Sequence, residues 1–403
     1  MDNYKKILLD EYNKIRSMHL SLNMARGKPS SEQLSLSNEL ITKDINLKSE
    51  SGVDVRNYGE LTGLSETKKL FGDLMDVDPK NVIVYGGSSL NIMYDYISRS
   101  MTHGVNGYKP WSKLDVVKWI CPTPGYDRHF AICEYFGIQM INVPILDDGP
   151  DMDMIEELIK DESVKGIWCV PQYSNPSGVT YSNEVVKRFA RLKPAAKDFR
   201  IYWDNAYHAH HLYDNEQDKL LNIFDECKKH GSEDLVYEFV SFSKISFSGS
   251  GITAVIASDN NIKEIKKQLS IQTICFDKVN QMKHVAFFVD KEGVLNHMKK
   301  HAEILRPKFE LVDEILTKEV SDLASWNKPK GGYFVSLYVN NKAKEVIKRC
   351  LDMGLTLTEA GSSFPYHYDE SNSHIRIAPT YLSLKELETA MHILTLAIKI
   401  ECL

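Results

Sequence analysis

The stretch that decides the fold class of this chain is Leu235-Val236-Tyr237-Glu238-Phe239-Val240-Ser241-Phe242-Ser243-Lys244. Its first six residues are mostly apolar, as is typical of a buried strand, and Lys244 follows at the carboxyl end of that strand. The next segment, Phe247-Ser248-Gly249-Ser250-Gly251, predicts a flexible loop rich in hydrogen-bond donors. A lysine held dry in such a loop, beside a bound phosphate, can form a Schiff base with an aldehyde cofactor. A solvated lysine would show the same pattern, so further motifs have to support this interpretation.

A second predicted strand also ends at a polar residue. The run Phe199-Arg200-Ile201-Tyr202-Trp203 leads to Asp204, and Tyr207 follows three residues later. Open α/β sheets bind ligands at the carboxyl ends of their strands. A carboxylate there could keep the ring nitrogen of pyridoxal 5'-phosphate (PLP) protonated, and Tyr207 could donate a hydrogen bond to the phenolic oxygen of the ring. The alternative is that Asp204 only caps the helix that follows.

Two loops after predicted strands offer groups that could bind anions. Asn175 lies in Tyr173-Ser174-Asn175-Pro176-Ser177-Gly178, where its amide could bind both a cofactor oxygen and a substrate carboxylate. Asn-Pro followed by Gly is also ordinary turn chemistry. Gly87, Ser88 and Ser89 precede a helical run from 90 to 99. Backbone amides and hydroxyls at a helix N-terminus can hold a phosphate, and they can equally cap the helix.

Arg376 is the last candidate of this kind. It alternates with apolar residues in His374-Ile375-Arg376-Ile377-Ala378-Pro379, which predicts a short strand. A guanidinium in that position suits bidentate binding of a carboxylate. An arginine at the exposed edge of a sheet is the other interpretation.

The order of these motifs resembles that of the fold-type I PLP-dependent aminotransferases of class I, and the resemblance covers nearly the whole chain. The motifs are, in order, Tyr58-x-x-x-x-Gly63, Gly86-Gly87-Ser88-Ser89, Pro124-Gly125-Tyr126, Asn175-Pro176-x-Gly178, Asp204-x-x-Tyr207, Ser241-x-Ser243-Lys244, Gly331-Gly332-Tyr333-Phe334 and Ile375-Arg376-Ile377. The amino-acid sequences of segments 22–29, 56–59, 122–130 and 203–207 resemble those of one subgroup, the bacterial aspartate aminotransferases called type Ic.

The resemblance implies catalytic roles for a few residues. Lys244 would hold PLP and carry the substrate's α-proton. Asp204 would pair with the ring nitrogen, with His129 behind it, and Tyr126 would stack on the ring. Tyr207 would contact the phenolic oxygen.

The resemblance also implies the binding contacts and the assembly. Tyr58 would reach the phosphate of a neighbouring subunit, in a homodimer with shared active sites. Arg376 would bind the substrate α-carboxylate. The other implied contacts are Gly87, Ser88, Ser89, Asn175, Ser241 and Ser243 to the cofactor, and Gly27 and Asn175 to the substrate.

Two parts of the expected site are not assigned by this pattern. Many class I aminotransferases carry a phosphate-binding arginine shortly after the Schiff-base lysine, but residues 245–252 contain no basic residue. Either hydroxyls and backbone amides bind the phosphate without an arginine, or a cation from another part of the chain contacts it. The cation that meets the distal carboxylate of a dicarboxylic substrate is also open. The candidates are Lys278, Arg26 and Arg128.

Strand-like and helical patterns alternate from about residue 60 to about 300, which predicts an α/β fold with a mostly parallel, helix-covered sheet. The resemblance refines this to fold type I, with a seven-stranded-type sheet. A chain of 403 residues is expected to form two domains. We expect a large PLP-binding domain over 50–300 and a small α+β domain formed by 1–49 and 301–403.

Composition excludes several other classes of protein. The net charge is −6 and no basic stripe occurs, which argues against nucleic acid and anionic membranes as partners. The seven cysteines are scattered, which predicts reduced thiols in a cytoplasmic protein. His208-Ala209-His210-His211 lacks the further ligands of a metal site, so no metal is expected.

The sequence therefore predicts an aminotransferase that exchanges an amino group between an amino acid, aspartate or glutamate, and a 2-oxo acid by a ping-pong route. A β-lyase or an aminotransferase for other amino acids would share the fold and the cofactor site. A non-catalytic regulator that uses such a domain as a sensor is a further alternative.

Overall fold

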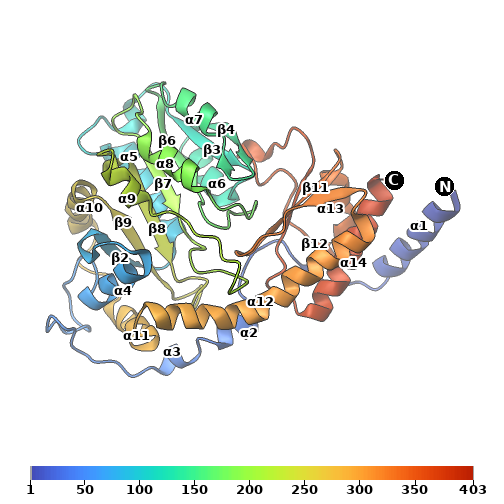
Figure 1. The fold of residues 1–403 in the computed structure, drawn as a ribbon, viewed down its shortest axis with the longest axis horizontal. Coiled ribbons are helices and arrows are strands. Elements are labelled where there is room, and N and C mark those ends of the chain that lie inside the picture. Colours follow the sequence, from blue (N-terminus) through green and yellow to red (C-terminus); the bar gives the residue numbers. More distant parts are fainter. Residues whose placement is uncertain (1, 403) are drawn as a thin grey trace.

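An eight-stranded sheet forms the centre of the larger part of the molecule in the computed structural model, which describes residues 2–402 (Figure 1). The strands, in their order across the sheet, are β2 (Val82–Gly86), β9 (Ile252–Ala257), β8 (Val236–Ser241), β7 (Arg200–Asp204), β6 (Val164–Cys169), β3 (Lys118–Thr123), β4 (Gln139–Leu146) and β5 (Gly149–Pro150). The pairs from β8 to β4 are parallel, whereas β9 is antiparallel to both of its neighbours. The predicted mostly parallel sheet is thus confirmed, with the two-residue β5 as an additional edge strand.

Helices cover both faces of this sheet, so its central strands β6, β7, β8 and β9 are buried at every position. Strands that are buried on both faces require continuous apolar runs, and the sequence supplies them. One face packs against α4 (Ser65–Met75), α7 (Met152–Leu158), α8 (Asn183–Arg191), α9 (Ile223–Lys228) and α11 (Lys278–Phe288). The other face packs against α5 (Ser89–His103), α6 (Asp127–Tyr135) and α10 (Asp259–Gln272).

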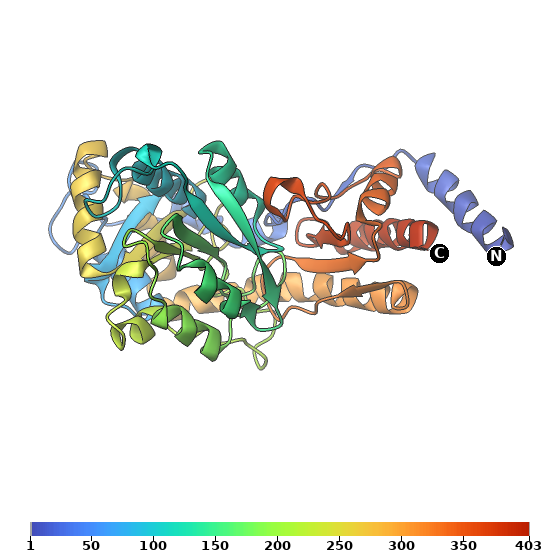
Figure 2. The same ribbon diagram turned by 90° about the horizontal axis from the view of Figure 1, so that it is seen from above.

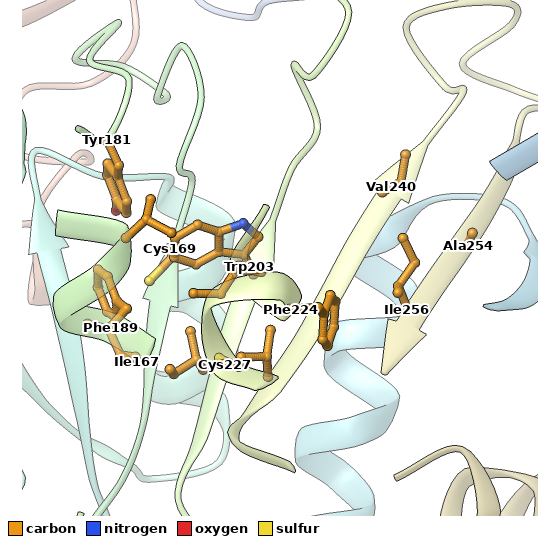
Figure 3. Packing of buried hydrophobic residues seen from close by; sticks show 14 of the residues in the cluster. Ile167, Cys169, Tyr181, Phe189, Trp203, Phe224, Cys227, Val240, Ala254 and Ile256 are labelled. Carbon is orange, nitrogen blue, oxygen red and sulfur yellow. The ribbon is translucent and has the colours of Figure 1, made fainter. Parts of the chain in front are cut away.

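Figure 3 shows part of the hydrophobic core on the first face, the one covered by α4, α7, α8, α9 and α11. Trp203 of β7 lies among Phe189 of α8 and Tyr181, and all three are fully buried. Burying the Phe189 side chain contributes about 1.5–3 kcal/mol relative to leaving it in water. Gly166 of β6 is needed on the opposite face, because a Cβ there would lie 2.3 Å from the ring of Trp119.

A smaller part of the molecule combines the two ends of the chain. Its antiparallel sheet has the order β10 (Ala324–Trp326), β11 (Val335–Val339) and β13 (His374–Ile377). The N-terminal strand β1 (Leu22–Asn23) pairs with β12 (Leu355–Thr356). Helices α1 (Asp2–Arg16), α13 (Ala343–Asp352) and α14 (Leu384–Cys402) complete this part, and the described ends of the chain lie at its far side (Figure 2).

The 30-residue helix α12 (Lys291–Val320) runs from the large sheet to the smaller part (Figure 1). Its first turns contribute to the core of the large sheet and its later turns to the core of the smaller part. The division at residue 300 stays a prediction, and it would fall inside this helix. Short elements complete the chain: α2 (Ser31–Ser35), α3 (Glu39–Thr42) and the 3-10 turns Pro79–Asn81, Trp111–Lys113, Glu233–Leu235 and Pro365–His367. None of the helices in residues 2–402 has the length and apolar character needed to cross a membrane.

A buried ion pair lies near the amino ends of the parallel strands of the large sheet. Lys165 of β6 donates to Asp198 at 2.7 Å, and Trp111 donates from its indole nitrogen to the other oxygen at 2.8 Å. The side chains of the ion pair are only 10% and 5% exposed. Both charges are therefore balanced inside the protein, and removing one of them leaves the other without a partner.

We predict that Asp198→Ala lowers the free energy of unfolding by about 3–5 kcal/mol, because Lys165 and the Trp111 N–H lose their acceptors. Urea denaturation followed by tryptophan fluorescence measures this. The double variant Lys165→Met/Asp198→Leu should lose less, since no buried charge is left. Glu157→Gln, which breaks an exposed pair with Lys160, is the control and should have little effect. A loss below about 1 kcal/mol for Asp198→Ala would contradict the assignment.

Candidate active site

A cavity of about 710 Å³ lies where the carboxyl ends of the parallel strands meet the smaller part of the molecule. Most of the residues singled out from the sequence line it. They are Arg26, Gly27, Ser88, Ser89, Tyr126, Arg128, Asn175, Asp204, Tyr207, Ser241, Ser243, Lys244 and Arg376. They come from the N-terminal segment, from the carboxyl ends of β7 and β8, from the segments that follow β2, β3, β6, β7 and β8, and from β13. Parallel strands bring these loops together because all of their carboxyl ends meet at one edge of the sheet.

Lys244 follows β8 by three residues and borders the cavity. Its Nζ lies 5.1 Å from the centre of the Tyr207 ring. Desolvation lowers the pKa of Lys244, and the charge of Asp204 offsets part of that change. A lowered pKa increases the fraction of neutral amine, which is the nucleophilic form.

Asp204 is the last residue of β7 and is 3% exposed. One oxygen, Oδ2, lies 3.2 Å from Nε2 of His129, while Oδ1 has no partner in the described chain. His129, on α6, is stacked on Trp168 with the ring centres 4.5 Å apart, so its orientation is fixed. A buried carboxylate oxygen without a partner is costly, and a ligand that donates an N–H would satisfy it.

Asn175 provides a second unpaired acceptor. It is buried, and its Oδ1 has no hydrogen-bond partner in residues 2–402. Tyr126 borders the same space and packs edge-on against His129. Burial, with the nearby charges of Asp127 and Asp204, raises the pKa of Tyr126 to about 12. Burial also raises the pKa of Tyr207 well above its usual value, so both hydroxyls stay protonated at neutral pH.

Hydroxyl groups form the wall of the cavity near β8. Oγ of Ser241 lies 2.7 Å from Oγ of Ser243, and the Thr253 hydroxyl donates to the carbonyl of Gly87 at 2.8 Å while its oxygen lies 3.0 Å from Oγ of Ser241. Ser88 is the N-cap position of α5, but its side chain makes no capping hydrogen bond. This wall joins hydroxyls to a helix N-terminus, a combination that suits a phosphate. Thr253 was missed from the sequence, although the antiparallel register of β8 and β9 places it opposite Ser241.

The opposite wall comes from the smaller part of the molecule. Arg376 of β13 is buried, and its guanidinium carbon lies 5.1 Å from the centre of the Phe334 ring. Gly27 lets the N-terminal segment lie against the same ring, because a Cβ there would be 2.4 Å from Phe334 Cζ. Arg376 donates to Asp127 at 2.9 Å and to Thr358. Asp127 and Thr358 could not be predicted from the sequence, because no local sequence pattern indicates that they contact Arg376.

Arg26 and Arg128 line the cavity, and neither forms an ion pair within the described residues. Lys278 and Tyr58 do not line it. Lys278 is only 2% exposed, and its Nζ donates to the carbonyls of Asn57 at 2.5 Å and Gly59 at 3.1 Å. Lys278 therefore lies outside the cavity of its own chain, and its role toward a substrate carboxylate stays a prediction. Tyr58, between the two carbonyls, is 74% exposed.

Known proteins share both this sequence pattern and this fold. A model of the aspartate amino-transferase family matches residues 2–402. An aspartate aminotransferase from Corynebacterium glutamicum is 44% identical over 387 residues, which are 94% of this chain and 89% of that protein. The structure of an aspartate transaminase from C. glutamicum has a TM-score of 0.96 at 42% identity and covers 100% of this chain and 96% of that one.

A more distant structure has the same fold. It is an α-aminoadipate aminotransferase from Thermus thermophilus in complex with N-(5'-phosphopyridoxyl)-L-leucine, with a TM-score of 0.75 at 18% identity. It covers 97% of this chain and 94% of that one. The resemblance to PLP-dependent aminotransferases of fold type I is thus confirmed. This chain belongs to the aspartate amino-transferase family, a family of transaminases.

Proposed function

We propose that this chain is a cytoplasmic, PLP-dependent aminotransferase that exchanges an amino group between aspartate or glutamate and a 2-oxo acid. One observation carries the proposal. Lys244, whose pKa is lowered, lines the same cavity as Asp204, which has one buried oxygen without a partner. A nucleophilic amine and an unpaired carboxylate oxygen are the two groups that an aldehyde on a pyridine ring requires.

PLP fits the donors and acceptors of this cavity. Oδ1 of Asp204 would accept the ring N–H, and His129 would hold the other oxygen in place. Tyr126 would cover one face of the ring. The hydroxyls of Ser88, Ser89, Ser241 and Ser243, with the N-terminus of α5, would bind the phosphate in place of the missing arginine.

The bound cofactor supplies a conjugated ring that takes up the electrons of the substrate Cα–H bond. Lys244 has two tasks in this scheme. Its neutral Nζ would hold the cofactor between turnovers, and the amine would carry the α-proton of the substrate. Tyr207 would donate to the phenolic oxygen of the cofactor, and its raised pKa keeps the donor proton on its hydroxyl. Asn175 and Arg376 orient the substrate carboxylate.

Lys244→Ala should abolish amino transfer, because the covalent attachment and the proton carrier are lost together. The direct measurement is borohydride reduction with PLP, followed by peptide mapping, which should mark Lys244 alone. Lys28→Ala removes the other lysine that lines the cavity and should leave this label in place. To identify the amino donor, single amino acids are added in turn and the change in PLP absorbance is recorded for each. A pyridoxyl label on another residue would overturn the assignment.

We further propose that Arg26 or Arg128 binds the distal carboxylate of a dicarboxylic substrate. Both are exposed cations at the cavity, and both are free of ion pairs in the described chain. Replacing the true partner with alanine should lower kcat/KM for aspartate by the equivalent of about 2–5 kcal/mol, because a bound carboxylate loses its charge partner. Alanine as the amino donor has no distal carboxylate and is the internal control. Equal losses with both donors would exclude that arginine.

The assembly that we propose is a homodimer in which Tyr58 enters the site of the second subunit. Support comes from its 74% exposure and from its position outside the cavity of its own chain. The buried ammonium of Lys278 binds the carbonyls on both sides of Tyr58, so it fixes the loop that presents the ring.

Lys278→Met should loosen this loop, because two charge-assisted hydrogen bonds disappear. We expect amide exchange at residues 57–59 to become at least about tenfold faster, as measured by hydrogen–deuterium exchange. Lys283→Met is the matched control on the same helix, since Lys283 donates to the carbonyl of Ile41 and not to this loop. Unchanged exchange at 57–59 would show that Lys278 does not hold the loop.

A further inference from the structure

The guanidinium of Arg376 has most of its donors engaged by the protein. Nε and Nη2 both donate to Oγ1 of Thr358, at 3.2 and 3.1 Å. Nη2 also lies 3.3 Å from the carbonyl of Ala25. Nη1 donates to Oδ1 of Asp127 at 2.9 Å. Thr358 therefore occupies the Nε side of the fork, and a carboxylate that binds with two parallel bonds has to use the Nη1 and Nη2 end.

At that end Asp127 competes for Nη1, whereas the carbonyl of Ala25 lies at the longer distance of 3.3 Å from Nη2. Its carboxylate makes the same kind of bond to Nη1 that a substrate carboxylate would make. The two partners differ in how firmly they are held. The Arg376 side chain is 6% exposed and is fixed by Thr358 and Phe334, whereas the Asp127 side chain is 28% exposed and has no second hydrogen-bond partner in residues 2–402. Asp127 is thus the partner that can leave.

The backbone position of Asp127 is consistent with a mobile side chain. It is the first residue of α6, and its side chain borders the cavity next to Tyr126. A carboxylate in the first turn of a helix is stabilised by the helix dipole, so Asp127 keeps a favourable environment after it leaves Arg376. The ion pair with Arg376, in turn, balances the buried guanidinium while no substrate is bound.

We propose that Asp127 is an internal carboxylate that occupies Arg376 in the empty site and is displaced by the substrate carboxylate. It therefore sets how tightly the site binds its substrates. This inference rests on the proposed function, in which Arg376 binds the substrate. The alternative is that Asp127 is a fixed support that orients Arg376. The two roles predict opposite effects of neutralising Asp127, because removing a competitor strengthens binding and removing a support weakens it.

The test is calorimetric titration of succinate, an unreactive dicarboxylate, into the PLP-saturated chain. Asp127→Asn keeps the size of the side chain and removes its charge, and we expect the Kd of succinate to fall by about tenfold. Asp127→Ala should show the same direction. In steady-state kinetics the KM for the amino acid should fall while kcat changes little, since the competitor acts only on binding.

The control separates competition at Arg376 from a general change in charge. Glu359 lines the same cavity and forms no ion pair within residues 2–402, so Glu359→Gln removes one negative charge without touching Arg376. We expect less than about a twofold change in Kd for this variant. Melting temperatures and near-UV circular dichroism of all variants establish that they are folded.

Three results would overturn the inference. They are unchanged or weaker succinate binding by both Asp127 variants, equal tightening by Glu359→Gln, and no succinate binding by any form of the chain. The proposed function fails separately, if borohydride does not mark Lys244 or if no amino acid changes the PLP absorbance. The titration needs neither the label nor turnover, so the two failures are distinguishable.

Discussion

The parallel pairing of β6, β7 and β8 is the constraint on which the rest of this site depends. In the register of β7 and β8, Asp204 lies opposite Phe239, two residues before Ser241. On the other side, Trp203 lies opposite Cys169, the last residue of β6. Three loops therefore leave the sheet at one edge and bring Asn175, Asp204 and Lys244 to one cavity. A shift of the register by one residue would turn these side chains away from each other.

Burial gives these groups their chemistry. The apolar cores on both faces of the sheet exclude water from the strand ends, which lowers the pKa of Lys244 and leaves oxygen atoms of Asp204 and Asn175 without partners. Each unsatisfied buried acceptor costs about 1–3 kcal/mol of stability. The fold thus keeps polar groups in a state that a ligand improves. Stacking of His129 on Trp168 holds the imidazole beside Oδ2 of Asp204 and so fixes the geometry of the carboxylate.

The smaller part of the molecule supplies the other half of the cavity and its electrostatics. The pairing of β1 with β12 attaches the N-terminal segment, so that Ala25, Gly27 and Thr358 gather around Arg376. The helix α12 links this assembly to the large sheet without an intervening loop (Figure 1). Two of the three arginines that line the cavity, Arg26 and Arg376, therefore come from the ends of the chain, whereas Asn175, Asp204 and Lys244 come from the middle.

The sequence by itself determined the sheet and most of the cavity lining. Buried strands need unbroken apolar runs, and the polar residue that ends each run lies at the edge where such sheets bind ligands. Lys244, Asp204, Asn175 and Ser241 could be found in this way. Tertiary structure alone decided the partners of the charged groups. Asp127 and Arg376 are 249 positions apart, and Lys278 meets carbonyls more than two hundred residues away. Local patterns fix where a backbone goes, but the contacts of a long side chain depend on which distant segment packs against it.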